Sequence, residues 1–145
     1  MFRTGVSKIS EPLVWHLWQL HLPKCRPLRL TDGRKLRVLA AGRFNRDSGP
    51  DFLDARFTFG PGQPVKGDVE MHLHPTDWLR HGHTADPRYN AVALHVVMWN
   101  EEGLTVYKQN GQYVPTLVLS DNLTEDFERL QKQYESRKEW DSLPQ

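Results

Sequence analysis

Cysteine is nearly absent from the sequence, with Cys25 the only one among 145 residues. One cysteine cannot form a disulfide within the chain. Cys25 is also too far from the histidines to indicate a zinc knuckle, so we expect a half-buried loop residue. Long apolar runs are absent too, and without one the chain has neither a membrane span nor the apolar core of a signal peptide. These absences favour a cytoplasmic, bacterial-type protein with no membrane partner.

An excess of either charge is also missing. Nineteen Lys and Arg residues stand against eighteen Asp and Glu residues, which gives a formal net charge of +1. This balance gives no overall electrostatic footprint for nucleic acid, although it leaves room for a local basic patch. For a chain of 145 residues we expect a single domain, with a flexible N-terminus (1–9), a core (10–119) and a C-terminal helix (123–140).

Capping residues and turn residues divide the chain into short elements. Ser10 is placed to cap a first helix and Thr124 to cap the last one. Asp32-Gly33 and Asn110-Gly111 are typical of hairpin turns. The expected strands are 28–30, 36–40, 51–59, 67–74, 91–99, 104–108 and 113–119, with a short helix at 76–83. This order predicts an α+β fold with a curved mixed sheet.

The segment 67–74 carries the strongest chemical signal. Side chains alternate faces along a strand, so the polar residues of this segment share one face and the apolar residues share the other. The polar set is Asp68, Glu70, His72 and His74. Such a row is costly on a buried surface, because buried charges need partners. It is therefore typical of a reaction site, a metal site or a solvated face.

Two carboxylates on neighbouring strands are the minimum for a divalent-metal site that cleaves phosphodiesters. Asp51 opens one expected strand and Glu70 lies in the middle of the next. With His72 two residues after Glu70, the pattern resembles the PD-(D/E)xK nuclease superfamily, in which Pro-Asp is followed by Glu-x-Lys. The resemblance implies a restriction-endonuclease-like sheet flanked by an N-terminal and a C-terminal helix. It also implies Mg²⁺ or Mn²⁺ held by Asp51 and Glu70, with Glu11 completing the site.

His72 departs from the superfamily pattern, which has Lys there. A lysine is a fixed positive charge, whereas histidine is cationic only when its pKa is raised. In the nuclease interpretation His72 orients or deprotonates the attacking water. The expected substrate is DNA or RNA, and its phosphates would be met by basic residues near the site: Arg43, Arg46, Arg56 and Lys66.

Histidine gives a competing interpretation. Five of the seven histidines fall between His72 and His95. Imidazoles with a carboxylate suit Zn²⁺ or a similar transition metal, and such a site is either catalytic or structural. Its candidate ligands are His72, His74, His81, His83 and Asp86. We expect His95, isolated on an apolar strand, to be a hydrogen-bonded core residue instead.

From about residue 11 to residue 119 the chain is similar to an uncharacterised bacterial family, domain-of-unknown-function 2851. The matching residues are Asn45, Ser48-Gly49-Pro50-Asp51-Phe52, Ala55, Gly67–His72, Asp77-Trp78, His81-Gly82-His83, Asp86, Tyr89-Asn90, Leu94–Val97 and Val114–Leu117. This family has no established activity. Its longer members resemble this chain only in their N-terminal part, so we expect a compact version or a fragment. A third hypothesis is therefore a non-catalytic module that binds nucleic acid or protein on a nuclease-like scaffold.

Overall fold

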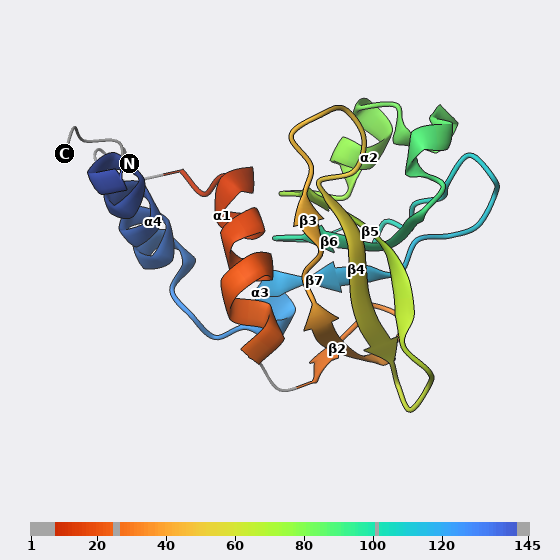
Figure 1. Cartoon of the computed structure of the whole chain (residues 1–145), viewed down its shortest axis with the longest axis horizontal. Coiled ribbons are helices and arrows are strands. Elements are labelled where there is room, and N and C mark those ends of the chain that lie inside the picture. Colours follow the sequence, from red (N-terminus) through yellow and green to blue (C-terminus); the bar gives the residue numbers. More distant parts are fainter. Residues whose placement is uncertain (1–7, 25–26, 101, 142–145) are drawn as a thin grey trace.

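The computed structural model describes residues 8–24, 27–100 and 102–141, and Cys25 lies outside them. The fold is α+β, with a seven-stranded mixed sheet and with the N-terminal and C-terminal helices together on one side of it (Figure 1). The strands are β1 (Leu28–Arg29), β2 (Lys35–Ala40), β3 (Arg43–Phe44), β4 (Phe52–Phe59), β5 (Val65–His72), β6 (Val92–Val97) and β7 (Thr116–Val118). The α-helices are α1 (Glu11–His16), α2 (Thr76–Arg80), α3 (Leu119–Asn122) and α4 (Phe127–Asp141). The π- and 3₁₀-helices are η1 (Leu17–His21), η2 (Leu22–Lys24), η3 (His83–Ala85) and η4 (Pro87–Tyr89).

The sheet changes from antiparallel to parallel at β5. Its strand order is β1-β2-β4-β5-β6-β7, and β3 pairs with β4 beside β2. The pairs from β1 to β5 are antiparallel, whereas β5–β6 and β6–β7 are parallel. A parallel pair needs a crossover connection. The crossover from β5 to β6 contains α2, η3 and η4, so this segment returns over the end of β5.

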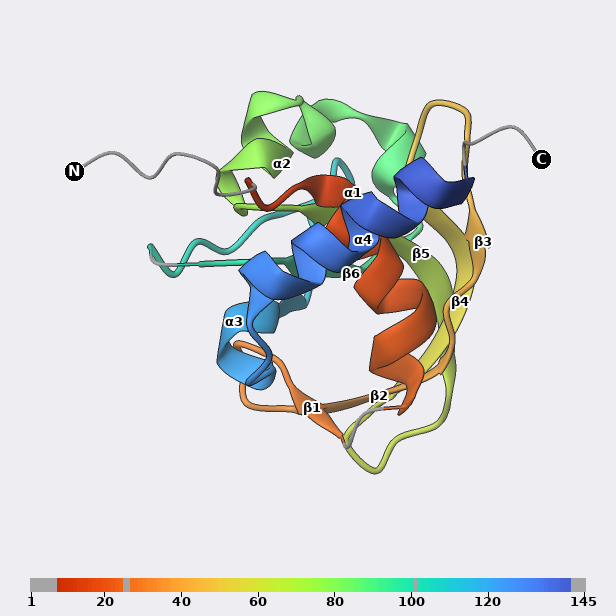
Figure 2. The same ribbon diagram turned by 90° about the vertical axis from the view of Figure 1, so that its left-hand side faces the viewer.

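The sheet curls around the first helix. A bridge between Leu30 and Leu117 brings the chain after β1 to β7, the far end of the strand order. Figure 2 shows α1 inside this curve and α4 crossing over it. Leu13, Val14 and Trp18 of the α1–η1 segment are completely buried, and Phe127, Leu130 and Tyr134 of α4 pack against the same core. The expected flanking helices and curved mixed sheet are thus confirmed.

Both helix caps differ from expectation. The Ser10 side chain makes no cap hydrogen bond; its hydroxyl donates instead to Gln131 Oε1 of α4 at 3.0 Å. The last helix begins at Phe127 rather than near residue 123, because Leu123 is extended and the Asp126 carboxylate accepts the N–H of Arg129. Neither the hydrogen bond from Ser10 to Gln131 nor the cap at Asp126 follows from the local sequence pattern.

Several strand boundaries also differ. β5 ends at His72, so His74 lies beyond the strand and the expected four-residue polar face ends at His72. The Asn110-Gly111 turn forms, but segment 104–108 is not a strand and pairs only through the bridge between Tyr107 and Tyr113. The described residues contain no helix with the length and apolar character needed to cross a membrane.

A β-bulge displaces the start of β4. Between Phe52 and Ala55 the strand has one more residue than β5 opposite it, and Asp54 takes a left-handed conformation with φ 58°. Bulges redirect neighbouring side chains. Just before this point, the Asn45 side chain donates to the Pro50 carbonyl at 2.9 Å, and the Asn45 N–H donates to the Asp51 carbonyl at 2.8 Å. The turn that presents Asp51 is therefore fixed from both sides.

Candidate metal centre

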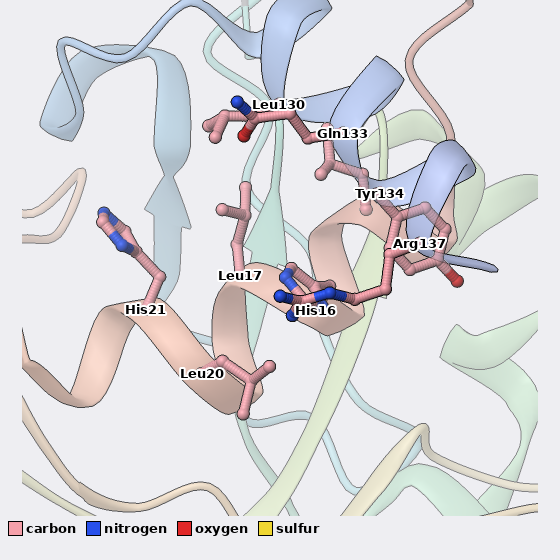
Figure 3. Close-up of a pocket in the computed structure, with 9 residues that line it drawn as sticks. His16, Leu17, Leu20, His21, Leu130, Gln133, Tyr134 and Arg137 are labelled. Atoms are coloured by element: carbon pink, nitrogen blue, oxygen red, sulfur yellow. The ribbon is translucent and has the colours of Figure 1, made fainter. Parts of the chain in front are cut away.

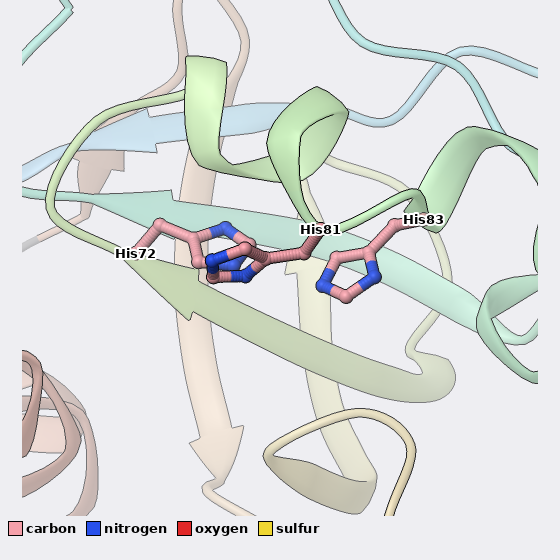
Figure 4. Close-up of side chains that lie close together, drawn as sticks. All are labelled: His72, His81 and His83. Atoms are coloured by element: carbon pink, nitrogen blue, oxygen red, sulfur yellow. The ribbon is translucent and has the colours of Figure 1, made fainter.

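Three histidines meet where the crossover segment returns over β5. His72 is the last residue of β5, His81 follows α2, and His83 begins η3. One ligand nitrogen from each lies within 4.8 Å of the other two (Figure 4). His72 and His83 are buried, whereas His81 is exposed. This group, called the histidine triad below, can hold a metal ion.

The crossover segment fixes the two later histidines by packing and by a tight turn. Gly82 between them has φ 72°, a conformation that glycine adopts readily. Trp78 of α2 is completely buried and meets the His83 ring edge-on, with centroids 5.3 Å apart. Tyr89 of η4 stacks on the His83 ring, with ring centroids 3.8 Å apart at 19°. Two aromatic side chains thus pack against the His83 ring.

The carboxylates of the nuclease interpretation lie against this triad. Glu70 is 4% exposed, and its Oε2 is 2.6 Å from His83 Nε2 and 3.4 Å from His72 Nε2. Its other oxygen, Oε1, accepts the N–H of Asp51 at 3.2 Å. The Asp51 carboxylate in turn accepts the N–H of Met71 at 2.9 Å. The carboxylates and the histidines, which the sequence suggested as two competing sites, therefore form one cluster.

Negative groups are crowded in this cluster. Burial and then the nearby Glu70 carboxylate raise the pKa of Asp51 to about 8, and burial raises the pKa of Glu70 to about 7. Burial, Asp51 and Asp77 raise the pKa of Glu11, which His81 and His83 lower. Glu11 is thus within electrostatic range of the cluster from the start of α1. Like charges in a buried site need protons or a cation.

Burial favours the neutral form of the His72 and His83 imidazoles. Burial, followed by His95 and the other triad members, lowers the pKa of His72 to about 2. The pKa of His83 is also lowered, chiefly by burial, against the opposing effect of Asp86 and Asp51. Neutral imidazole is the form that binds metals. His72 and His83 are therefore in their ligating form at neutral pH.

His95 lies directly behind His72. It is completely buried on β6, and its Nε2 is 2.8 Å from His72 Nδ1. The expectation of a hydrogen-bonded core histidine is confirmed. With Nδ1 engaged, His72 presents Nε2 to the cluster. Metal-binding histidines commonly use their second nitrogen in this way, which fixes the ring orientation.

Polar atoms of the cluster are left without partners. Both ring nitrogens of His83 are buried and lack a hydrogen bond, and so does His95 Nδ1. The 2.6 Å approach of His83 Nε2 to Glu70 is thus a close contact without hydrogen-bond geometry. A buried polar atom without a partner costs about 1–3 kcal/mol. A cation bound at this point would give His83 Nε2 and Glu70 Oε2 a common partner.

Other candidate residues lie apart from this group. His74 is exposed beyond β5, and its ring packs 5.3 Å from that of Trp99. Asp86 caps η4 and pairs with Arg88 at 2.7 Å. Within the described residues the metal-capable group does not include either one.

The expected phosphate contacts also divide into two groups. Arg43 pairs with Asp54 at 2.5 Å, and Lys66 approaches the same carboxylate at 3.9 Å. Arg46 is exposed in the turn before Asp51, and Arg56 is exposed on β4. The support that Trp78 and Tyr89 give to His83 was not predicted, because it depends on how the crossover folds.

A separate groove of about 540 Å³ lies between the α1–η1 segment and α4 (Figure 3). Leu17, Leu20, His16 and His21 line one side, and Leu130, Tyr134 and Arg137 line the other. None of the triad or its carboxylates lines this groove. The groove is therefore distinct from the metal-capable cluster.

These observations define an α+β protein with a histidine triad that can hold a metal ion and with the Glu70 carboxylate in contact with it. Residues 11–142 match the family described as "Protein of unknown function (DUF2851)", so the chain belongs to that family. No curated protein and no solved structure matches the chain. The resemblance to the PD-(D/E)xK nucleases therefore rests on the sequence motif alone.

Proposed function

We propose that this chain is a metal-dependent hydrolase that cleaves phosphodiester bonds with a transition-metal ion. The observation that carries the proposal is the contact of Glu70 with His83 and His72, at 2.6 and 3.4 Å. It joins the carboxylate pair expected for hydrolysis to a nitrogen-donor site. The sequence motif supplies the phosphodiester part of the proposal.

The donor set favours Zn²⁺ or Mn²⁺ over Mg²⁺. The histidine triad supplies three imidazole nitrogens and Glu70 supplies a carboxylate oxygen. Imidazole suits zinc and related transition metals, whereas Mg²⁺ prefers oxygen ligands and water. A bound ion of this kind polarises a phosphoryl oxygen and lowers the pKa of bound water.

Asp51 is placed to handle the proton of the attacking water. It is half-buried, and it touches the cluster through Glu70 without belonging to the triad. Its carboxylate accepts a proton when it is ionised, and the Met71 N–H fixes its orientation. Positioned general bases typically contribute 10²–10⁴-fold to the rate. His95 holds the His72 ring from behind and so positions that ligand.

A structural metal site is the second candidate. The burial of His72 and His83 favours it, because structural zinc sites are closed by four protein ligands. The exposure of His81 favours the catalytic alternative, since one side of the triad reaches solvent.

The test uses the full chain, purified without a histidine tag and stripped with chelator. Metal content is measured after loading with Zn²⁺, Mn²⁺ or Mg²⁺, and cleavage of labelled single-stranded DNA, duplex DNA and RNA is followed. We expect one transition-metal ion per chain in the wild type and in the control His74→Gln. We expect none in His83→Gln. Asp51→Asn should keep the metal and lose cleavage by 10²-fold or more.

Two results would overturn the proposal. Stoichiometric metal binding without cleavage of any of these substrates would favour the structural site. Cleavage that persists unchanged in both Glu70→Gln and Asp51→Asn would place the chemistry elsewhere.

A further inference from the structure

We infer that the exposed face of strands β2, β4 and β5 binds the phosphodiester backbone of nucleic acid. This inference rests on the proposed function, because it supplies the substrate contact of the same site. The residues that carry it are called the basic face below: Lys35, Arg37, Arg56 and Lys66. Of these four residues, Arg56 and Lys66 were expected from the sequence to contact phosphates, whereas Lys35 and Arg37 were not.

Side-chain alternation places these four residues on one face of the sheet. Along β2, Leu36 and Val38 are buried in the core while Lys35 and Arg37 are exposed. Arg56 is exposed between buried neighbours on β4, as Lys66 is at the start of β5. The buried residues of these strands face α1, which lies with α4 on one side of the sheet (Figure 1). The basic face is therefore the opposite side.

The basic residues are close together across the strands. Arg56 and Lys66 are direct register partners of β4 and β5, and Arg37 of β2 lies opposite Thr58 of β4. Like charges directly opposite each other destabilise a sheet. The sheet thus carries an electrostatic cost here that a bound polyanion would remove.

Most of this positive charge is not neutralised by the protein. Within the described residues, no ion pair involves Lys35, Arg37 or Arg56. Asp54 neutralises Arg43 and approaches Lys66 only at 3.9 Å, and the Lys66 side chain remains 60% exposed. Since the whole chain has a net charge of only +1, this concentration is local. It indicates a polyanionic partner.

The basic face and the metal-capable cluster share one side of β5. Val69 and Met71 point into the core, so Lys66, Glu70 and His72 point the other way. Lys66 and Glu70 are four residues apart, or roughly 13 Å along the strand. On this side of β5, Glu70 and His72 are buried whereas Lys66 is exposed. A backbone held on the basic face would therefore lie beside the cluster.

The experiment compares two triple variants of the full chain. Lys35→Gln/Arg37→Gln/Arg56→Gln removes three charges from the basic face. The control removes three exposed charges from α4: Arg129→Gln/Lys132→Gln/Lys138→Gln. Binding of labelled single-stranded and duplex 30-mers is measured by fluorescence anisotropy in chelator, from 50 to 200 mM salt. Circular dichroism confirms that each variant is folded.

We expect the basic-face variant to bind at least about 10-fold more weakly at 50 mM salt, and the control to bind like the wild type. Each lost phosphate contact reduces the slope of log affinity against log salt by about 0.9 for duplex DNA, so three contacts reduce it by about 2–3. Equal binding by the two variants would overturn the inference. So would wild-type binding to phosphatidylserine vesicles, but not to nucleic acid, that is lost in the basic-face variant.

Because binding is measured without metal, it is independent of cleavage. Wild-type binding that is lost only in the basic-face variant, with no cleavage by any metal-loaded form, would support the basic face and contradict the hydrolase. Cleavage that is unchanged in the basic-face variant would contradict the basic face and leave the hydrolase standing.

Discussion

Replacing His83 with phenylalanine should remove metal binding without destabilising the metal-free protein. The Phe ring can keep the stack on Tyr89, where the His83 ring lies 3.8 Å away at 19°. Both His83 nitrogens are buried without a hydrogen bond, at a cost of about 1–3 kcal/mol for a buried polar group. We therefore expect metal-free His83→Phe to be more stable than the wild type by about 1 kcal/mol. For a chain of this size that is roughly 2–4 °C in Tm.

Metal should reverse this order. A ligand that binds only the folded state at 100 times its Kd stabilises by about 2.7 kcal/mol. With the same conversion, Zn²⁺ at that concentration should raise the wild-type Tm by roughly 5–11 °C. His83→Phe, which has lost one nitrogen ligand of the triad, should show little or no shift.

The assay is thermal unfolding by circular dichroism, in chelator and in a Zn²⁺ titration. His74→Gln is the matched control, because His74 lies outside the triad, and it should keep the full metal shift. His83→Leu is a smaller apolar replacement in case the Phe ring is too large for its site. The reasoning is refuted if Zn²⁺ stabilises His83→Phe as much as the wild type. It is refuted as well if both apolar variants are clearly less stable than the wild type in chelator.

Three further predictions test other parts of the structure. The pKa of Asp51 is raised from 3.8 to about 8, so the native state keeps a proton that the unfolded chain loses, and the free energy of unfolding falls as pH rises between these values. In urea titrations, metal-free Asp51→Asn should therefore be more stable than the wild type at pH 8 but not at pH 4. Asp32 is hydrogen-bonded to Arg34, and its pKa is lowered to about 2, so its stabilisation of the fold is full above pH 3.8 and is lost as pH falls towards 2. Asp32→Asn should therefore lower the free energy of unfolding by about 1 kcal/mol at pH 7 and by less at pH 3. A cost that does not change with pH would contradict this. A Cβ at Gly67 would lie 2.5 Å from the Ala93 Cβ, so Gly67→Ala should lower the free energy of unfolding in urea by about 1–3 kcal/mol. The double variant with Ala93→Gly should recover most of that loss. No recovery would locate the strain elsewhere.

Local sequence patterns were sufficient to predict most of the fold. Asp32-Gly33 forms its turn, and the apolar segment from 91 to 99 contains β6, because these signals depend on neighbouring residues. The pattern at 104–108 was misleading. Its turn closes, but the segment pairs through a single bridge and does not extend the sheet. Turn chemistry determines where a chain reverses, whereas strand formation also needs a partner along its length.

The candidate site was predictable in its parts but not in its assembly. Alternation along β5 correctly placed Glu70 and His72 on one face. It failed for His74, because the strand ends two residues earlier. The meeting of Glu70 with His83 depends on the crossover from β5 to β6, and no local pattern specifies the path of that segment. Two site hypotheses that were separate in sequence are therefore a single cluster in space.

Unpartnered polar atoms are the strongest argument that this cluster binds something. Gln131, another buried polar residue at 2% exposure, is satisfied: it accepts the Ser10 hydroxyl and donates to Glu135. Among the described residues five buried side-chain atoms lack a hydrogen bond, and three of them belong to His83 and His95. Native proteins rarely keep such atoms without a reason. Burial raises the pKa of the neighbouring Asp51 to about 8 and that of Glu70 to about 7, so a divalent cation that binds beside them and coordinates His83 would favour loss of their protons. Metal loading should therefore release protons from the protein, which an unbuffered titration with a pH indicator can measure.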